Sequence, residues 1–194
     1  MAWKNDQVSE IETEKVLKLA QACIMREGDY VELGCYRGDT SLLLADLLDG
    51  SGKRLYIYDS FEGLPEKSAE DSSALGTAFR GGELYVTKRE VKERFLRANL
   101  PVPVIKKAWF SDLGSEDLPE KIAFAFLDGD FYESIKDSLR LVGSKMTSSG
   151  IIVVHDYNNP ALPGVKKATD EWMMGRDGLR TEIFQSMLII YFNA

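Results

Sequence analysis

The segment Tyr30-Val31-Glu32-Leu33-Gly34-Cys35-Tyr36-Arg37-Gly38-Asp39 sets the architecture of the chain, because a short strand here runs into a glycine turn. Glycine lets the backbone approach a ligand without a Cβ in the way. A dinucleotide fingerprint would need glycine at positions 36 and 39, where Tyr36 and Asp39 stand. Asp39 would also put negative charge at the helix start that cradles a pyrophosphate. The segment therefore favours a ligand with an amine or a positive charge, or else it is a plain strand-to-helix turn.

Outward from this segment, strand and helix patterns alternate along the chain. Strands are expected at residues 30–34, 55–59, 102–108, 122–127, 151–154, 179–184 and 187–192. Helices are expected within residues 1–27, at 40–48, from 87 onward, after 130 and at 165–174. Such alternation predicts a mostly parallel sheet with helices on both faces. We therefore expect an α/β, Rossmann-like fold with a C-terminal antiparallel hairpin, formed as a single domain over residues 1–194.

Two helix starts and one long connection stand out. Ser9-Glu10-Ile11-Glu12 and Thr87-Lys88-Arg89-Glu90 both have the capping-box pattern, in which each end residue satisfies a backbone amide of the new helix. Residues 61–86 are polar and contain glycine, and they are too many for a routine connection. We expect this segment to act as a lid or substrate loop.

Acidic side chains follow several of the expected strands. They are Glu32, Asp59, Asp128 with Asp130, and Asp156 beside His155. Parallel sheets bind ligands at the carboxyl ends of their strands, so these side chains are expected to share one site. Asp59 could accept both hydroxyls of a ribose, although it could instead cap a helix or lie in solvent. A ribose and a cationic group together describe S-adenosylmethionine.

Composition excludes several other classes of protein. The chain has 44% hydrophobic and 28% charged residues, which is typical of a globular protein and not of a disordered one. A net charge of −7 disfavours nucleic acid as a partner. We expect no membrane span and no signal peptide, hence a cytoplasmic protein in which Cys23 and Cys35 are buried thiols. A single histidine, His155, excludes a histidine-rich zinc site.

Five segments resemble one family of enzymes. The turn Glu32–Gly38 is similar to motif I of class I S-adenosylmethionine-dependent methyltransferases. The other four segments are Tyr58–Pro65 (YDSFEGLP), Ala108–Asp112 (AWFSD), Leu127–Ser134 (LDGDFYES) and His155–Tyr157 (HDY). In order and spacing they resemble the macrocin O-methyltransferase family, which methylates antibiotic sugars. The resemblance covers roughly residues 28–175 and implies a seven-stranded sheet of order 3-2-1-4-5-7-6.

The resemblance also implies a metal and a general base. Carried over, Asp128 ligates a divalent cation, Asp130 takes the proton of the acceptor hydroxyl, and Asp156 belongs to a second acidic pair near the metal. In that pair His155 stands where the family has aspartate. Magnesium prefers oxygen ligands, whereas imidazole suits manganese, iron or zinc. His155 therefore either changes the metal, or leaves the coordination shell and acts through a hydrogen bond.

The expected reaction is O-methylation of a hydroxyl on a sugar, a glycan or a glycosylated small molecule, with S-adenosylmethionine and a divalent cation (Mg or Mn). Residues expected to hold the cofactor are Glu32, Gly34, Gly38, Asp59, Ser60, Ala108, Trp109 and Asp128. Those expected to hold the metal are Asp128, His155 and Asp156, with Asp130 catalytic. Two alternatives stay open: a metal-independent or silent cofactor-binding module, and an NAD-dependent nucleotide-sugar oxidoreductase. A homodimer is also left open.

Overall fold

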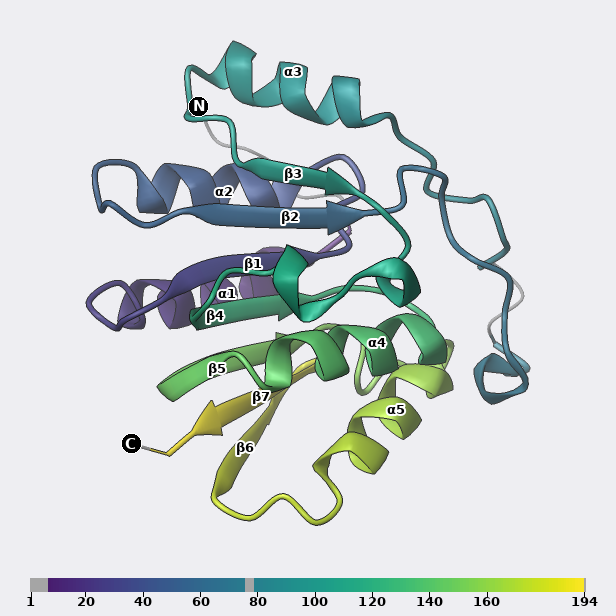
Figure 1. Cartoon of the computed structure of the whole chain (residues 1–194). Coiled ribbons are helices and arrows are strands. Elements are labelled where there is room, and N and C mark those ends of the chain that lie inside the picture. The colour runs from purple at the N-terminus through teal and green to yellow at the C-terminus, as the bar shows by residue number, and fades with distance from the viewer. Residues whose placement is uncertain (1–6, 76–78, 194) are drawn as a thin grey trace.

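A computed structural model describes residues 7–75 and 79–193 and has a single seven-stranded sheet, with order β3-β2-β1-β4-β5-β7-β6 (Figure 1). Strands β1 to β5 run parallel, and β7 is antiparallel to both β5 and β6. The strands are β1 (Asp29–Leu33), β2 (Leu55–Asp59), β3 (Val104–Lys107), β4 (Ile122–Leu127), β5 (Met146–Val154), β6 (Leu179–Phe184) and β7 (Met187–Phe192). The fold class, the C-terminal hairpin and the strand order expected from the sequence are confirmed.

In the described part of the chain, five α-helices cover the sheet on its two faces. They are α1 (Glu10–Ala22), α2 (Asp39–Leu48), α3 (Lys88–Ala98), α4 (Tyr132–Gly143) and α5 (Pro163–Met173). Helices α1, α2 and α3 contribute to one hydrophobic cluster, and α4 and α5 contribute to the other. Strand β4 lies between these clusters, and all of its residues are buried. Its continuous apolar run, with no polar alternation, is typical of a strand covered on both faces.

Some boundaries differ from the sequence-based ones. The first helix is expected within residues 1–27, but α1 begins at Glu10 and ends at Ala22; residues 1–6 of that range lie outside the described part of the chain. Strand β3 is shorter than residues 102–108, and β5 begins at Met146, five positions before the apolar run that marked it. After Met146 the extra part of β5 consists of polar residues and a glycine (147–150), so hydropathy does not identify it as strand.

The two capping boxes have different outcomes. Thr87 and Glu90 form the reciprocal pair at the start of α3. At α1, Ser9 accepts a hydrogen bond from the Glu12 amide and donates its hydroxyl to one oxygen of the Glu12 carboxylate at 2.5 Å. The other oxygen of Glu12 accepts from the backbone amide and hydroxyl of Ser186, at 3.0 and 2.6 Å. Glu12 therefore ties α1 to the turn between β6 and β7. Both cysteines are free and buried, as expected.

Within residues 7–75 and 79–193, none of the helices is both long and apolar enough to span a bilayer.

Candidate active site

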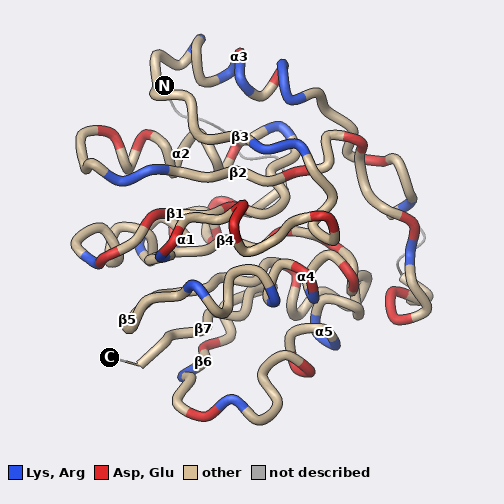
Figure 2. The backbone as a smooth tube through the Cα atoms, viewed as in Figure 1, with Lys and Arg blue, Asp and Glu red and all other residues tan. Residues whose placement is uncertain are grey.

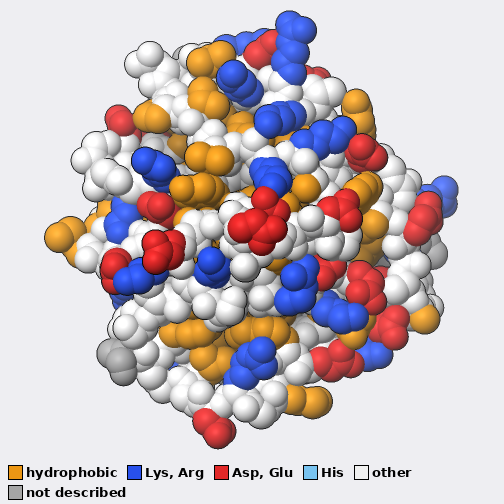
Figure 3. Space-filling model, viewed as in Figure 1, with side chains coloured by type: hydrophobic (Ala, Val, Ile, Leu, Met, Phe, Trp, Pro, Cys, Tyr) orange, Lys and Arg blue, Asp and Glu red, His pale blue; other side chains and the backbone are white. Residues whose placement is uncertain are grey.

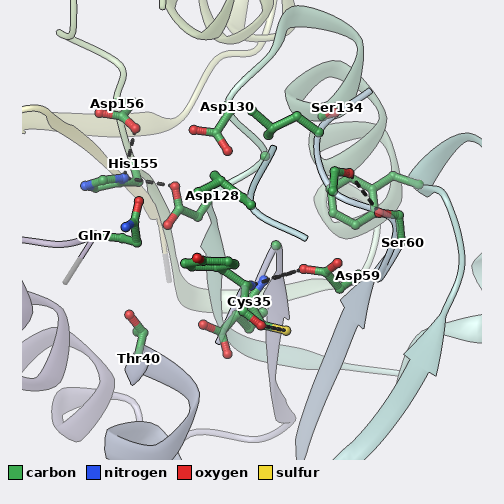
Figure 4. Close-up of a pocket in the computed structure, with 18 of the residues that line it drawn as sticks. Gln7, Cys35, Thr40, Asp59, Ser60, Asp128, Asp130, Ser134, His155 and Asp156 are labelled. Carbon is green, nitrogen blue, oxygen red and sulfur yellow. Dashed lines mark hydrogen bonds and ion pairs between the residues drawn. The ribbon is translucent and has the colours of Figure 1, made fainter. Parts of the chain in front are cut away.

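The carboxyl ends of β1, β2, β4 and β5 open onto one cavity (Figure 4). A cavity at the carboxyl ends of parallel strands is where sheets of this kind bind their ligands. The predicted site residues that line it are Glu32, Gly34, Asp59, Ser60, Ala108, Trp109, Asp128, Asp130, His155 and Asp156. The predicted cofactor residue Gly38 does not line this cavity. It is the N-cap residue of α2 and has a φ of 79°.

The glycine turn after β1 is held by the end of β2. One carboxylate oxygen of Asp59 accepts hydrogen bonds from the backbone amides of Cys35 and Tyr36, at 2.9 and 3.2 Å. Its other oxygen accepts from the Phe61 amide at 2.8 Å. A carboxylate has about four acceptor positions, so Asp59 keeps capacity for a ligand hydroxyl. Asp59 thus shapes the turn and faces the cavity at once.

Gly34 is the position in this turn where a side chain has no space. Its φ is 87°, and a Cβ there would lie 2.0 Å from the carbonyl oxygen of Asp128. The backbones of β1 and β4 therefore meet directly behind the cavity. This close approach brings the two strand ends, and the polar groups that follow them, into one site.

Glu32 is almost completely buried, with 1% of its surface exposed. The Ser41 hydroxyl donates a hydrogen bond to its carboxylate. Burial raises the pKa of Glu32 to about 8, with smaller contributions from the charges of Asp128 and Asp59. The Glu32 carboxyl therefore holds a proton until a positive group, such as a ligand amine, comes close to it.

A second group of ionisable side chains lies across the cavity. Nδ1 of His155 is 2.9 Å from Oδ1 of Asp128 and 3.1 Å from Oδ2 of Asp156, as the dashed lines of Figure 4 show. The side-chain amide of Asn159 donates to the other Asp156 oxygen at 2.9 Å. Burial alone would lower the pKa of His155, but the two carboxylates outweigh it and raise that pKa well above its usual value.

Asp130 lies on the same side of the cavity as Asp128 and Asp156 (Figure 4). Its backbone is left-handed, with φ of 61°, in the short link between β4 and α4. Burial, reinforced by the charges of Asp128 and Asp156, raises the pKa of Asp130 well above its usual value. A carboxylate with a raised pKa is a stronger base than an ordinary aspartate.

Apolar and aromatic groups close the remaining wall of the cavity. Trp109 and Phe110 follow β3, and Phe79 and Leu84 come from the long segment 61–86. The segment therefore does line the cavity; its movement as a lid stays a prediction. Aromatic faces of this kind stack well on a flat base such as adenine.

Several lining residues were not predicted individually as site residues. They are Gln7, Val8, Thr40, Phe79, Leu84, Ser134 and Asn159. Ser134 lies within the string Leu127–Ser134, which could have marked it. Gln7 and Asn159 are polar residues in loops of ordinary composition, and only the folded chain brings them to the site.

The charges around the site are mixed. Figure 2 shows acidic positions gathered at the ends of the central strands, whereas Figure 3 shows basic and acidic side chains intermixed over the outer face. Asp39, which faces the cavity, is paired with Arg94 of α3 at 2.5 Å. This pairing moderates the negative charge at the start of α2.

The cluster of Asp128, His155 and Asp156 could hold a divalent cation. One possible ligand atom from each residue lies within 4.8 Å of the others. A donor set of two carboxylates and one imidazole suits manganese, iron or zinc better than magnesium.

The sheet order, the antiparallel β7 and a site at the strand ends define the class I methyltransferase fold. Residues 13–186 match the family model described as Macrocin-O-methyltransferase (TylF), and the chain belongs to this family. Its solved relatives include the O-methyltransferase NovP, with a TM-score of 0.80 and 26% identity over 94% of this chain and 79% of that one.

Two curated relatives have similar sequences. One is 8-demethyl-8-(2,3-dimethoxy-alpha-L-rhamnosyl)-tetracenomycin-C 4'-O-methyltransferase of Streptomyces olivaceus, 32% identical over 80% of this chain. The other is demethyldecarbamoylnovobiocin O-methyltransferase of Streptomyces niveus, 30% identical over 75% of this chain. The chain spans only 61% and 58% of the lengths of these relatives.

Proposed function

We propose that the protein is an S-adenosylmethionine-dependent O-methyltransferase that methylates a hydroxyl group of a glycosylated small molecule. The observation that carries this proposal is the position of Asp130 beside Asp128, His155 and Asp156, in a cavity at the strand ends of a class I methyltransferase fold. Membership of the family and the names of its relatives, which refer to sugar-bearing antibiotics, support the acceptor class.

The chain's own residues would bind the cofactor along β1 and β2. Asp59 would accept the ribose hydroxyls, and Glu32 would face the amine of the methionine part. The missing side chain of Gly34 lets the β1 and β4 backbones meet beside the cavity, and Trp109 would border the adenine. Ser60, Ala108 and Asp128 complete the proposed binding set. When bound, S-adenosylmethionine supplies the methyl group as an activated sulfonium substituent.

The other side of the cavity would hold the acceptor. Asp130 would accept the proton of the hydroxyl, which is worth about 10²–10⁴ in rate for a positioned base. Asp128, His155 and Asp156 would hold a divalent cation, which when bound lowers the pKa of a coordinated hydroxyl. Positioning of the two reactants contributes most, since effective molarities of about 10⁵ M or more are attainable.

A metal-independent form of the same reaction has one observation in its favour. Nδ1 of His155 already lies within hydrogen-bonding distance of both carboxylates. In that form His155 would hold Asp128 and Asp156 in place without a cation, and Asp130 alone would act on the acceptor. The NAD-dependent oxidoreductase is not supported, because the fold and the family are those of methyltransferases.

The direct test is a transfer assay with methyl-labelled S-adenosylmethionine and a panel of glycosides, nucleotide sugars and free aglycones. The proposal expects label in glycosides only, and loss of transfer in an Asp130→Asn variant. Label in the aglycones would contradict the acceptor class. No transfer with any acceptor, in a protein that also fails to bind the cofactor, would contradict the proposal itself.

A further inference from the structure

The long segment 61–86 is fastened to the catalytic side of the fold by one buried side chain. Asp71 ends the short 3-10 helix η1 (Ala69–Asp71) and is only 1% exposed. One of its carboxylate oxygens accepts hydrogen bonds from the amide and hydroxyl of Ser68, at 2.9 and 2.6 Å. These contacts fix Asp71 relative to its own segment and leave its other oxygen to reach elsewhere.

That other oxygen, Oδ1, accepts a hydrogen bond from the backbone amide of Tyr132 at 2.7 Å. Tyr132 is the first residue of α4, and the N-cap residue Phe131 has a hydrocarbon side chain that cannot accept a hydrogen bond. Asp71 therefore caps α4 from a distant part of the chain. Its negative charge also complements the positive end of the helix dipole.

The start of α5 closes over the same contact. A Cβ on Gly164 would lie 1.9 Å from Oδ1 of Asp71 and 2.9 Å from the Tyr132 amide nitrogen. Three segments thus meet at one carboxylate: the segment 61–86, the start of α4 and the start of α5. The Asp71 carboxylate and Gly164 fill the space here, so a side chain at position 164 would collide with the carboxylate.

Asp130 lies two residues before the amide that Asp71 holds. Its left-handed backbone is costly for a residue with a side chain, and such a conformation persists only where the surroundings impose it. At one end of the link, the Asp128 amide donates to the Leu33 carbonyl at 2.9 Å. At the other end, the Asp71 carboxylate holds Tyr132. The carboxyl group of Asp130 is placed between these two anchors.

We propose that Asp71 is a positioning residue: its carboxylate fixes the Asp128–Tyr132 link, and so the place of Asp130, while tying residues 68–71 to the start of α4. The catalytic part of this inference rests on the proposed function. The same contact explains the glycine at position 164, since a larger residue there would displace the carboxylate.

The test uses two variants that disturb the contact in different ways, Asp71→Ala and Gly164→Ala. The matched control is Ser73→Ala, which removes the neighbouring tether from the Ser73 hydroxyl to the Pro160 carbonyl (2.8 Å) and leaves Tyr132 alone. Amide hydrogen exchange is followed at Phe131 and Tyr132, together with Mn²⁺ affinity and S-adenosylhomocysteine affinity. All measurements are made well below the melting temperature of each variant.

In both test variants the amide hydrogens of Phe131 and Tyr132 should exchange at least tenfold faster than in the wild type. Both variants should also bind Mn²⁺ about tenfold more weakly, which is the lower end of the loss seen when a contact that supports a metal ligand is removed. S-adenosylhomocysteine affinity should change less than threefold, because Asp128 is the one proposed cofactor residue that belongs to the link. The control Ser73→Ala should match the wild type. An Asp71→Ala protein with a lower melting temperature but unchanged exchange and Mn²⁺ affinity would overturn the proposal. If Asp71→Ala fails to fold, Gly164→Ala decides by the same readouts.

Failure of the proposed function would be recognised separately. A wild-type protein that binds neither S-adenosylhomocysteine nor Mn²⁺ contradicts the methyltransferase assignment. In that case, the amide hydrogen exchange rates of the wild type and the Asp71→Ala variant still decide whether Asp71 holds the start of α4.

Discussion

Nδ1 of His155 lies 2.9 Å from Oδ1 of Asp128, at the place where the strand ends β4 and β5 come together. If the cluster of Asp128, His155 and Asp156 holds a cation, His155 would offer it a nitrogen ligand beside two carboxylates. Such a donor would affect which cation is preferred, because magnesium binds imidazole poorly and transition ions bind it well.

Replacing His155 by aspartate should therefore shift the metal preference. We expect the wild type to bind Mn²⁺ at least tenfold more tightly than Mg²⁺, and His155→Asp to narrow that ratio by strengthening Mg²⁺ binding relative to Mn²⁺. Calorimetric titration of both ions into each protein measures the ratio. An identical ratio in the two proteins would place His155 outside the coordination shell.

Asp130→Asn should abolish methyl transfer while leaving the cofactor site intact. The amide cannot take the proton, so turnover should fall by about 10²–10⁴. S-adenosylhomocysteine affinity should stay within a factor of about three. The matched control is Asp137→Asn on α4, where the carboxylate is paired with Arg140 at 3.1 Å on the outside of the molecule. Unchanged turnover in Asp130→Asn would remove Asp130 from the mechanism.

Glu32 gives the protein a pH-dependent stability with a definite sign. Burial raises the pKa of this carboxyl to about 8 in the folded protein, so the folded state binds the proton more tightly than the unfolded chain. Stability contributed by this group is therefore lost as the pH rises from about 4.5 to about 8. Glu32→Gln should match the wild type near pH 5 and exceed it, on the order of a few kcal/mol, near pH 9. Thermal unfolding at both pH values measures this, and a less stable variant at pH 9 would contradict the assignment.

Glu12 should have the opposite dependence on pH. Burial acts to raise its pKa, but hydrogen bonds from Ser186 and Ser9 outweigh burial and lower that pKa. Its stabilising contribution is then present above the unfolded value and lost as the pH falls through the folded value. Glu12→Gln should be less stable than the wild type by about 1–2 kcal/mol at pH 7, and nearly equal to it at pH 3. A difference that does not change with pH would mean that the charge of Glu12 plays no part.

The sequence was sufficient for the sheet and for most of the site because both depend on local signals. Glycine at position 34 and the acidic residues after each strand are visible in short windows, and parallel topology brings those strand ends together. The order of the strands in the sheet was predicted from the resemblance to a known family and not from these local signals. The site residues found in this way, from Glu32 to Asp156, line one cavity, with Gly38 as the exception.

The features that sequence reasoning missed depend on partners far apart in the chain. Glu12 bonds to Ser186, which is 174 positions away, and no window around Ser9 predicts that choice. Asp71 caps a helix that begins 61 positions later. Residues 147–150 of β5 are polar or glycine, and this part joins the strand because β4 is beside it, with Ile122 paired to Met146. Pairings of this kind are set by the folded chain as a whole.

The central claim is that this cavity binds S-adenosylmethionine, and calorimetric titration with S-adenosylhomocysteine tests it most directly. The titration is run with chelator and again with Mn²⁺ or Mg²⁺, with NAD as the control ligand. We predict binding of S-adenosylhomocysteine under each condition and no binding of NAD. Binding of NAD, or failure of S-adenosylhomocysteine to bind under any condition, would contradict the account.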